Sequence, residues 1–307
     1  MGLIKAAAAS VNSMAKDQWK EFFYRDSIPE DQIMVRAYKH QSAQSANSGS
    51  DDVITDGSII AVADGQCAIV VSNGKVIAIF MEPGENEFRT GDTYGIFSGS
   101  SAGKMLKEMG RRFSFGGDAP AIVHRVYYLN TKVIAGNRFG RGNSIPIRVL
   151  DEEKGIDIDC SLIMAGVYSF RVVDPEKIYK RVIGNVKQVY PVSYLISQMG
   201  GVIDNTLLMV AGNICKDGTR PYRLGSFIPQ ISEEIKDTAN ETLRDTLGIE
   251  IVSIAFDNFG LTDADTGIVR QIQVVSIAKD PLMAAAMLSE ARAEAMVEAA
   301  SNVPGGQ

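Results

Sequence analysis

Apolar residues near the start of the chain recur with the period of a helix. Between residues 3 and 23 one face carries Leu3, Ile4, Ala7, Ala8, Val11, Met14, Ala15, Trp19, Phe22 and Phe23. Polar residues occupy the opposite face, so an amphipathic helix is predicted within residues 1–28. Such a helix either lies in a membrane interface or packs on protein. The residues expected to make the membrane or partner contact are Leu3, Ile4, Val11, Trp19, Phe22 and Phe23.

Beyond a polar stretch at 41–50, the period of the apolar residues changes to two, which is typical of strands. The predicted strands cover 58–63, 67–71, 76–81, 122–129, 131–135, 145–149 and 156–173. Asn73-Gly74 predicts a tight antiparallel hairpin between the second and third of these strands. We therefore expect a β-rich first subdomain over residues 29–150.

A strand-to-helix junction is predicted at Asp174-Pro175-Glu176. Asp174 can cap a helix, Pro175 suits the first turn, and Glu176 suits the positive end of the helix dipole. Apolar and aromatic residues then keep a helical spacing as far as Tyr190, where Pro191 interrupts it.

Helices dominate the remaining sequence. They are predicted over 192–211, with Gly200-Gly201 as a potential interruption, and over 229–247, 262–278 and 281–300. The second helix should bury Ile231, Ile235, Ala239, Thr242 and Leu243, and end at Gly248. A strand over 249–256 follows it. The expected division is an α/β second subdomain over 151–260 and Ala/Glu-rich helices with a tail over 261–307, which makes the fold class α+β.

The last predicted helix has little apolar bulk with which to pack on its own domain. Glu290, Glu294 and Glu298 form an acidic stripe with a four-residue repeat, and the remaining positions are mostly alanine. Two hypotheses follow. The helix packs on copies of itself, with the glutamates facing solvent or a basic partner, or it is a loosely attached, frayed tail.

Composition narrows the class of protein. The 307 residues carry a formal net charge of −6, which argues against nucleic-acid binding. Cys67, Cys160 and Cys215 are odd in number and contain no Cys-x-x-Cys pair, which fits free thiols in a reducing cytosol. No apolar run reaches the about 20 residues of a membrane-spanning helix, and no secretory leader is recognisable. We expect a cytoplasmic protein without metal or cofactor.

Three patterns suggest chemistry, and each has a simpler reading. Gly99-Ser-Ser-Ala-Gly103 matches a nucleophile elbow with Ser101, with His40 or His124 as the base, but a plain loop is favoured because no strong strand precedes it. The segment 136–142 is glycine-rich and is read as a turn between strands rather than a phosphate site. Asp51, Asp52 and Asp56 could hold a calcium ion, but their spacing does not match an EF-hand loop. Asp157 and Asp159 share one strand face, which is interpreted as a solvent face.

Several segments together resemble the SPFH (band 7, prohibitin/stomatin-like) domain. The junction beginning at Asp174, the strand 248–255 and the Ala/Glu-rich helix 291–300 carry the resemblance. The chain is also similar to the bacterial YdjI-like branch, often called virion-core-protein-like. The segments that match this branch are 17–24, 61–67, 82–84, 112–118 and 127–132, although the C-terminal zinc ribbon common in that branch is missing.

The resemblance implies a scaffold without catalytic activity. It implies side-by-side assembly of copies into a ring or larger shell, usually on the inner face of a membrane, and recruitment of partner proteins. Lateral contacts are then expected at Asp174, Pro175 and Tyr179 and at Leu288, Glu290, Glu294 and Glu298. The alternative is a soluble self-assembling binding module without membrane contact, and a serine hydrolase using Ser101 is a remote third.

Overall fold

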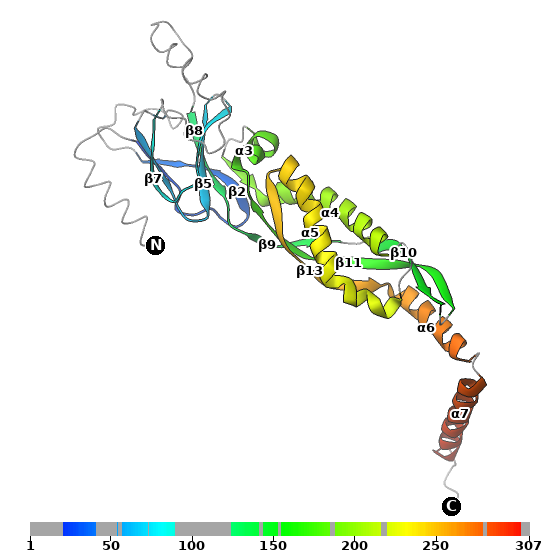
Figure 1. Ribbon diagram of the computed structural model, residues 1–307. Coiled ribbons are helices and arrows are strands. Elements are labelled where there is room, and N and C mark those ends of the chain that lie inside the picture. The colour runs from blue at the N-terminus through cyan, green and yellow to red at the C-terminus, as the bar shows by residue number, and fades with distance from the viewer. Residues whose placement is uncertain are drawn as a thin grey trace, which may run out of the picture. The chain divides into compact units, whose positions relative to one another are not determined.

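The computed structural model describes residues 21–40, 54, 57–72, 74–89, 124–140, 144–152, 155–184, 188–215, 220–278 and 281–301. These residues form the α+β fold expected from the sequence (Figure 1). The chain divides into two compact units. One consists of Met1–Asn137, Tyr168–Val202 and Asp237–Ser253, and the other of Arg138–Val167, Ile203–Lys236 and Ile254–Gln307.

The first sheet has the strand order β3-β1-β4-β7. Its strands are β1 (Phe22–Tyr24), β3 (Tyr38–His40), β4 (Ser58–Val62) and β7 (Gly84–Phe88). The prediction of an N-terminal helix that continues through Phe23 is therefore wrong for the last residues of that helix. β1 is hydrogen-bonded on both edges, to β3 and β4, and Phe22 and Phe23 are buried, so pairing and burial outweigh the local helical spacing. Residues 1–20 lie outside the described part.

The second sheet has the order β12-β2-β8-β5-β6. Its strands are β2 (Gln32–Arg36), β5 (Gln66–Ser72), β6 (Lys75–Phe80), β8 (His124–Asn130) and β12 (Val189–Pro191). The predicted hairpin is confirmed, since β5 and β6 pair antiparallel and Gly74 at the turn has a φ of 79°. Every residue of β5 is buried.

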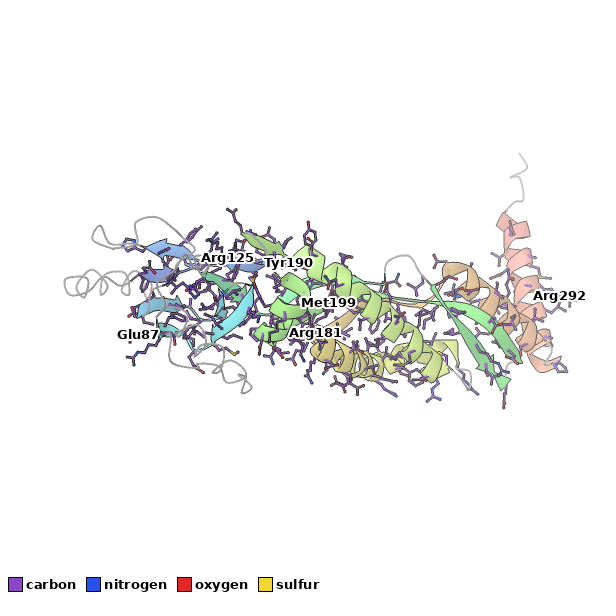
Figure 2. All side chains as sticks on the ribbon, turned by 90° about the horizontal axis from the view of Figure 1, so that it is seen from above. Glu87, Arg125, Arg181, Tyr190, Met199 and Arg292 are labelled. Carbon is purple, nitrogen blue, oxygen red and sulfur yellow. The ribbon has the colours of Figure 1, made fainter. Side chains whose placement is uncertain are left out.

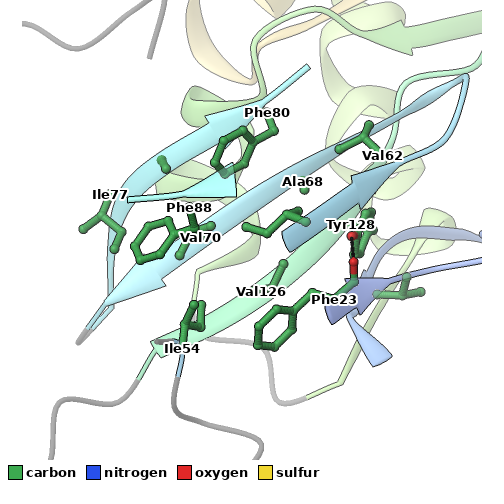
Figure 3. Close-up of a cluster of buried hydrophobic side chains, with 13 residues drawn as sticks. Phe23, Ile54, Val62, Ala68, Val70, Ile77, Phe80, Phe88, Val126 and Tyr128 are labelled. Carbon is green, nitrogen blue, oxygen red and sulfur yellow. Dashed lines mark hydrogen bonds between the residues drawn. The ribbon is translucent and has the colours of Figure 1, made fainter. Parts of the chain in front are cut away.

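A hydrophobic core lies between these two sheets (Figure 3). β1, β4 and β7 of the first sheet and β2, β5, β6 and β8 of the second supply its buried side chains, among them Phe23, Ile60, Val70, Phe80, Phe88 and Val126. The Tyr128 hydroxyl ties the sheets together, because it lies 2.7 Å from the Ala61 carbonyl oxygen and 3.1 Å from that of Phe23.

The third sheet has the order β10-β11-β13, with β9 also paired to β11. Its strands are β9 (Ile134–Phe139), β10 (Ser144–Asp151), β11 (Ile156–Val172) and β13 (Ile249–Leu261). The strand predicted over residues 131–135 begins and ends before the observed strand. β9 pairs with β11 and extends beyond Gly136 to Phe139. The predicted turn over 136–142 is correspondingly wrong in its first half.

The described helices are α3 (Pro175–Ile178), the π-helical turn η2 (Tyr179–Ile183), α4 (Val192–Cys215), the short η3 (Pro221–Phe227), α5 (Ile228–Thr246), α6 (Asp263–Ala278) and α7 (Pro281–Ser301). α4 runs through Gly200-Gly201 without a break. α5 buries Ile231, Ile235, Ala239 and Leu243 as predicted, whereas Thr242 is exposed.

The helix predicted from Pro175 to Tyr190 is wrong beyond Gly184. Gly184 has a φ of 57° and its N–H donates to the Tyr179 carbonyl, which ends η2. Val189–Pro191 then forms β12, which pairs antiparallel with the edge of β2. Tyr190 is buried there, so sheet pairing overrides the helical period in this segment.

Candidate functional site

The strand-to-helix junction is held by Asp174 at the end of β11. Its carboxylate accepts a hydrogen bond of 2.9 Å from the Lys177 N–H, and Pro175 occupies the first turn, as the sequence predicts. The N–H groups of Val173 and Asp174 both donate to the Gly248 carbonyl, at 3.0 and 2.9 Å. The junction is therefore fixed to the loop between α5 and β13.

Gly248 is the glycine that this close approach requires. Its φ is 71°, and a Cβ at this position would lie 2.7 Å from the Asp174 carbonyl oxygen. Its N–H also donates to the Leu243 carbonyl and closes the end of α5. Gly248 thus both ends α5 and accepts the hydrogen bonds that hold the junction.

Two cations of the junction cap the C-terminus of α5. The Lys177 ammonium donates to the Arg244 carbonyl at 2.8 Å, and the Arg181 guanidinium donates to the Asp245 carbonyl at 3.0 Å. Positive charge is favourable at this end of a helix, where the carbonyl groups lack helical partners. The basic residues of the junction therefore have a clear structural task.

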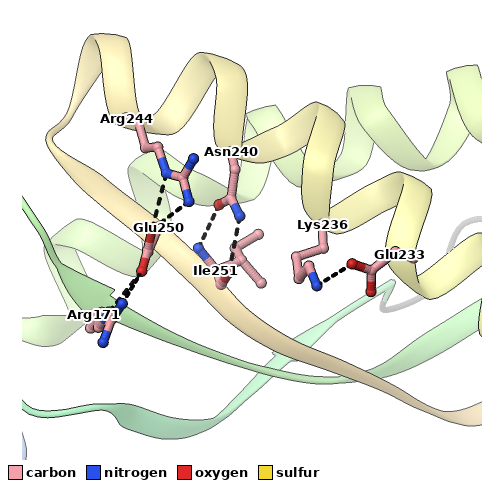
Figure 4. Close-up of polar contacts among 7 residues, drawn as sticks. All are labelled: Arg171, Glu233, Lys236, Asn240, Arg244, Glu250 and Ile251. Atoms are coloured by element: carbon pink, nitrogen blue, oxygen red, sulfur yellow. Dashed lines mark hydrogen bonds and ion pairs between the residues drawn. The ribbon is translucent and has the colours of Figure 1, made fainter.

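Glu250 on β13 joins two arginines (Figure 4). Its carboxylate accepts hydrogen bonds from Arg171 of β11 at 2.7 Å and from Arg244 of α5 at 2.6 and 3.0 Å. Burial by itself would raise the pKa of Glu250, but the hydrogen bonds from Arg244 and Arg171 hold the pKa below its ordinary value. The carboxylate is therefore kept ionised.

Asn240 binds β13 to α5 next to this group. Its side-chain carbonyl accepts from the Ile251 N–H at 2.6 Å, and its amide donates to the Ile251 carbonyl at 3.0 Å (Figure 4). The amide thus takes the role of a neighbouring strand for one residue of β13. The sequence pattern did not single out Asn240, Arg171, Arg244 or Glu250, although Asn240 is a buried polar residue on an otherwise apolar helix face.

Of the residues predicted to contact other copies at the junction, two are inside the protomer. Pro175 is buried, and Tyr179 is 2% exposed with its ring 6.0 Å from that of Tyr127. Burial raises the pKa of Tyr179 to about 12. Tyr179 thus packs against β8 of the second sheet, and a contact of the junction with a second copy stays a prediction.

α7 contrasts with the junction because nearly all its described side chains are exposed. Leu288, Met296 and Val297 are 56%, 73% and 70% exposed. Glu290, Glu294 and Glu298 are exposed too, and Figure 2 shows Arg292 among the side chains that project from this helix. The contact of these residues with a second copy stays a prediction.

The predicted N-terminal contact residues separate into two groups. Leu3, Ile4, Val11 and Trp19 lie outside the described residues. Phe22 and Phe23 are 7% and 2% exposed and belong to the core, so they do not offer a surface to lipid or to a partner.

Few of the residues considered for catalysis or for metal binding lie in the described part of the chain. Ser101, Asp51, Asp52 and Asp56 lie outside it. The Nδ1 atom of His124 is buried without a hydrogen-bond partner among the described residues, and burial lowers its pKa; His40 is exposed.

Asp157 of β11 is paired with an arginine. Asp157 accepts two hydrogen bonds of 2.7 Å from Arg148, which lowers the pKa of Asp157. Within the described ranges, no group of three or more metal-ligating side chains occurs. None of the helices in that part of the chain combines the length and hydropathy needed to cross a bilayer.

Comparison with models of protein families gives a match. The family model described as SPFH domain-Band 7 family matches residues 48–276. A comparison with curated proteins finds no match. The matched range includes β4 to β13 and most of α6, so it contains the junction, the Glu250 group and α4.

Proposed function

This chain belongs to the SPFH domain-Band 7 family, and we propose that it is a non-enzymatic scaffold whose copies assemble and organise partner proteins at a membrane surface. Proteins of this family are generally scaffold-like and associated with membranes. The folded body then gives the scaffold its shape and rigidity, and the exposed helices contact other copies.

The observation that carries the proposal is the exposure of α7. This helix has 21 residues, and it covers almost none of its described side chains against its own chain. Most helical stability in proteins comes from packing of one helix face, and α7 packs almost none of its described side chains. Neighbouring copies supply the missing packing in our proposal, and Leu288, Met296 and Val297 are the side chains they cover.

Truncation tests this role directly. A chain ending at Asp280 lacks α7, and we expect its native mass in light scattering to fall toward that of one protomer. The matched control ends at Ser301 and keeps the helix, so it should assemble with the same number of copies as the intact chain. Circular dichroism of both variants verifies that the body is folded. Assembly that survives removal of α7 would show that other surfaces hold the copies together.

The proposed membrane contact comes from the segment before β1. Leu3, Ile4, Val11 and Trp19 share one face of the amphipathic pattern, and this pattern suits an interfacial helix. Flotation with anionic and neutral liposomes measures the contact, with the intact chain compared against a variant lacking residues 1–20. We expect the intact chain alone to float. Failure of the intact chain to float would favour the soluble self-assembling module instead.

Catalysis by Ser101 is the remote alternative, and a fluorophosphonate probe decides it. The scaffold proposal expects no labelling of Ser101. Labelling that disappears in Ser101→Ala would assign a nucleophile to this serine and overturn the non-enzymatic part of the proposal.

A further inference from the structure

β7 is an edge strand that is anchored in the core by one side chain. It pairs with β4 on one side, and no other described strand pairs with it. Among its five residues only Phe88 is buried, and this ring lies in the core between the two sheets (Figure 3). Edge strands with few buried contacts open at low cost compared with the core of a domain. The attachment of β7 to the second sheet therefore depends on the surroundings of Phe88.

The polar neighbour of Phe88 is His124, which begins β8 of the second sheet. The two rings meet edge-on with their centroids 6.5 Å apart, so this contact joins β7 to β8. His40 is the other histidine of the chain, and it is exposed. Histidine is the side chain that ordinarily changes its charge between about pH 5 and 8. Mild acid therefore adds a charge to the inner face of the sheets through His124.

A protonated His124 finds little that replaces its water. The Nδ1 atom is buried and has no hydrogen-bond partner in the part of the chain that the structure describes. Ser72 lies directly opposite on β5 and is 2% exposed, and its hydroxyl is equally without a partner there. Rotation of the Ser72 side chain can offer a donor to the neutral imidazole. A single hydroxyl does not compensate the burial of a cation, which is far more costly than the burial of a neutral ring.

The charged groups near this contact on the inner faces of the sheets do not favour a further cation. Ser58 of β4, in the register position opposite the phenylalanine, donates to the Glu21 carboxylate at 3.3 Å, and Lys39 pairs with that carboxylate at 2.7 Å. Lys75 lies opposite Ser72 on β6 and adds positive charge to the same row of the second sheet. The nearby acid is thus already neutralised, and the nearby cation opposes protonation of the imidazole.

The charged neighbours along β7 and β8 lie on the other faces of their strands. Side chains alternate between the two faces, so Glu87 lies on the face opposite to Phe88, and Arg125 on the face opposite to His124. Glu87 also forms an ion pair of 3.0 Å with Arg89. Within the described ranges, neither strand therefore brings a carboxylate to the imidazole.

We propose that His124 is an acid-sensitive latch, which holds β7 against the second sheet when neutral and releases β7 when protonated. Burial lowers the pKa of His124 below its ordinary value of 6.5 in the closed structure, whereas release returns the imidazole to water. Opening is therefore favoured progressively as the pH falls below 6.5, and it gains nothing above that pH. Release also exposes the edge of β4 that β7 covers, and such an edge is a template for pairing with another strand. The inference concerns one protomer and does not depend on the proposed assembly.

Native-state hydrogen exchange tests the latch, with mass spectrometry of the peptide that covers β7 in the intact protein. After correction for the intrinsic effect of pH on amide exchange, the protection of this peptide should fall about three- to tenfold from pH 7.5 to 5.5. Local release exposes little surface, so urea below the unfolding transition should hardly accelerate this exchange, whereas it should accelerate exchange in the buried β5. Exchange of β7 only in step with β5 would show global unfolding and would overturn the latch.

Two histidine substitutions assign the response to one side chain. His124→Phe keeps an aromatic ring without the titrating nitrogens and should make the protection of β7 independent of pH. His40→Gln is the matched control and should keep the wild-type response, because His40 is exposed on β3. His124→Gln, which is neutral at every pH, replaces His124→Phe in the measurement if the phenylalanine variant does not fold. A pH response of β7 that persists in the His124 variant would rule out the latch.

Discussion

Replacement of Asn240 by alanine should destabilise the protein strongly for a single side chain. Asn240 is 5% exposed, and it satisfies both main-chain groups of Ile251 at 2.6 and 3.0 Å. Alanine leaves a buried N–H and a buried carbonyl without partners, and each such group costs about 1–3 kcal/mol. The better helix propensity of alanine returns about 0.5 kcal/mol. The expected loss in the free energy of unfolding is therefore about 2–5 kcal/mol.

Urea unfolding followed by circular dichroism measures this loss. Asn213→Ala provides the matched control, because it makes the same substitution at an exposed position of a helix, and it should change the free energy of unfolding by less than about 0.5 kcal/mol. Asn240→Asp keeps an acceptor for the Ile251 N–H but sets a carboxylate oxygen against the Ile251 carbonyl oxygen in a buried site, so it should lower the free energy of unfolding at least as much as Asn240→Ala at pH 7. Equal stability of Asn240→Ala and Asn213→Ala would refute the assigned role of the Asn240 amide.

Three further outcomes are expected. Gly248→Ala should lower the free energy of unfolding by about 1–3 kcal/mol in urea unfolding, because φ is 71° and the new Cβ approaches the Asp174 carbonyl; an unchanged midpoint would refute this. Glu250→Gln should lower the free energy of unfolding by about 1–2 kcal/mol at pH 7. Since the folded pKa of Glu250 lies below its ordinary 4.5, the wild-type advantage should be present above that pH and vanish as the pH falls through the folded pKa; a pH-independent difference would contradict it. His124 has a folded pKa lowered by burial, so the wild type should lose stability as the pH falls below 6.5, and His124→Gln should lose less; identical pH profiles of thermal unfolding would reject this.

Periodicity was sufficient for most elements with strong local signals. The hairpin at Asn73-Gly74, the cap at Asp174 and the stop at Gly248 depend on residues that act on their nearest neighbours, and the structure has all three where the sequence predicts them. The helical residues of α5 follow the same logic, because a buried stripe repeats at helical spacing. Thr242 was misplaced because it lies at the border of that stripe, where the period does not distinguish inside from outside.

Errors occurred where distant segments compete with local preference. Phe22, Phe23 and Tyr190 continue helical spacings, yet they lie in β1 and β12 because β3, β4 and β2 offer edges to pair with. The Arg171–Glu250–Arg244 group was not predictable for the same reason: Arg171 and Glu250 are 79 positions apart in sequence.

The native mass of the intact chain in light scattering tests the scaffold account most directly. One protomer has a mass of 33.2 kDa. The account predicts a mass that is a multiple of this value at micromolar concentration and that decreases when α7 is removed. A mass of one protomer across the accessible concentration range, with and without liposomes, would contradict it.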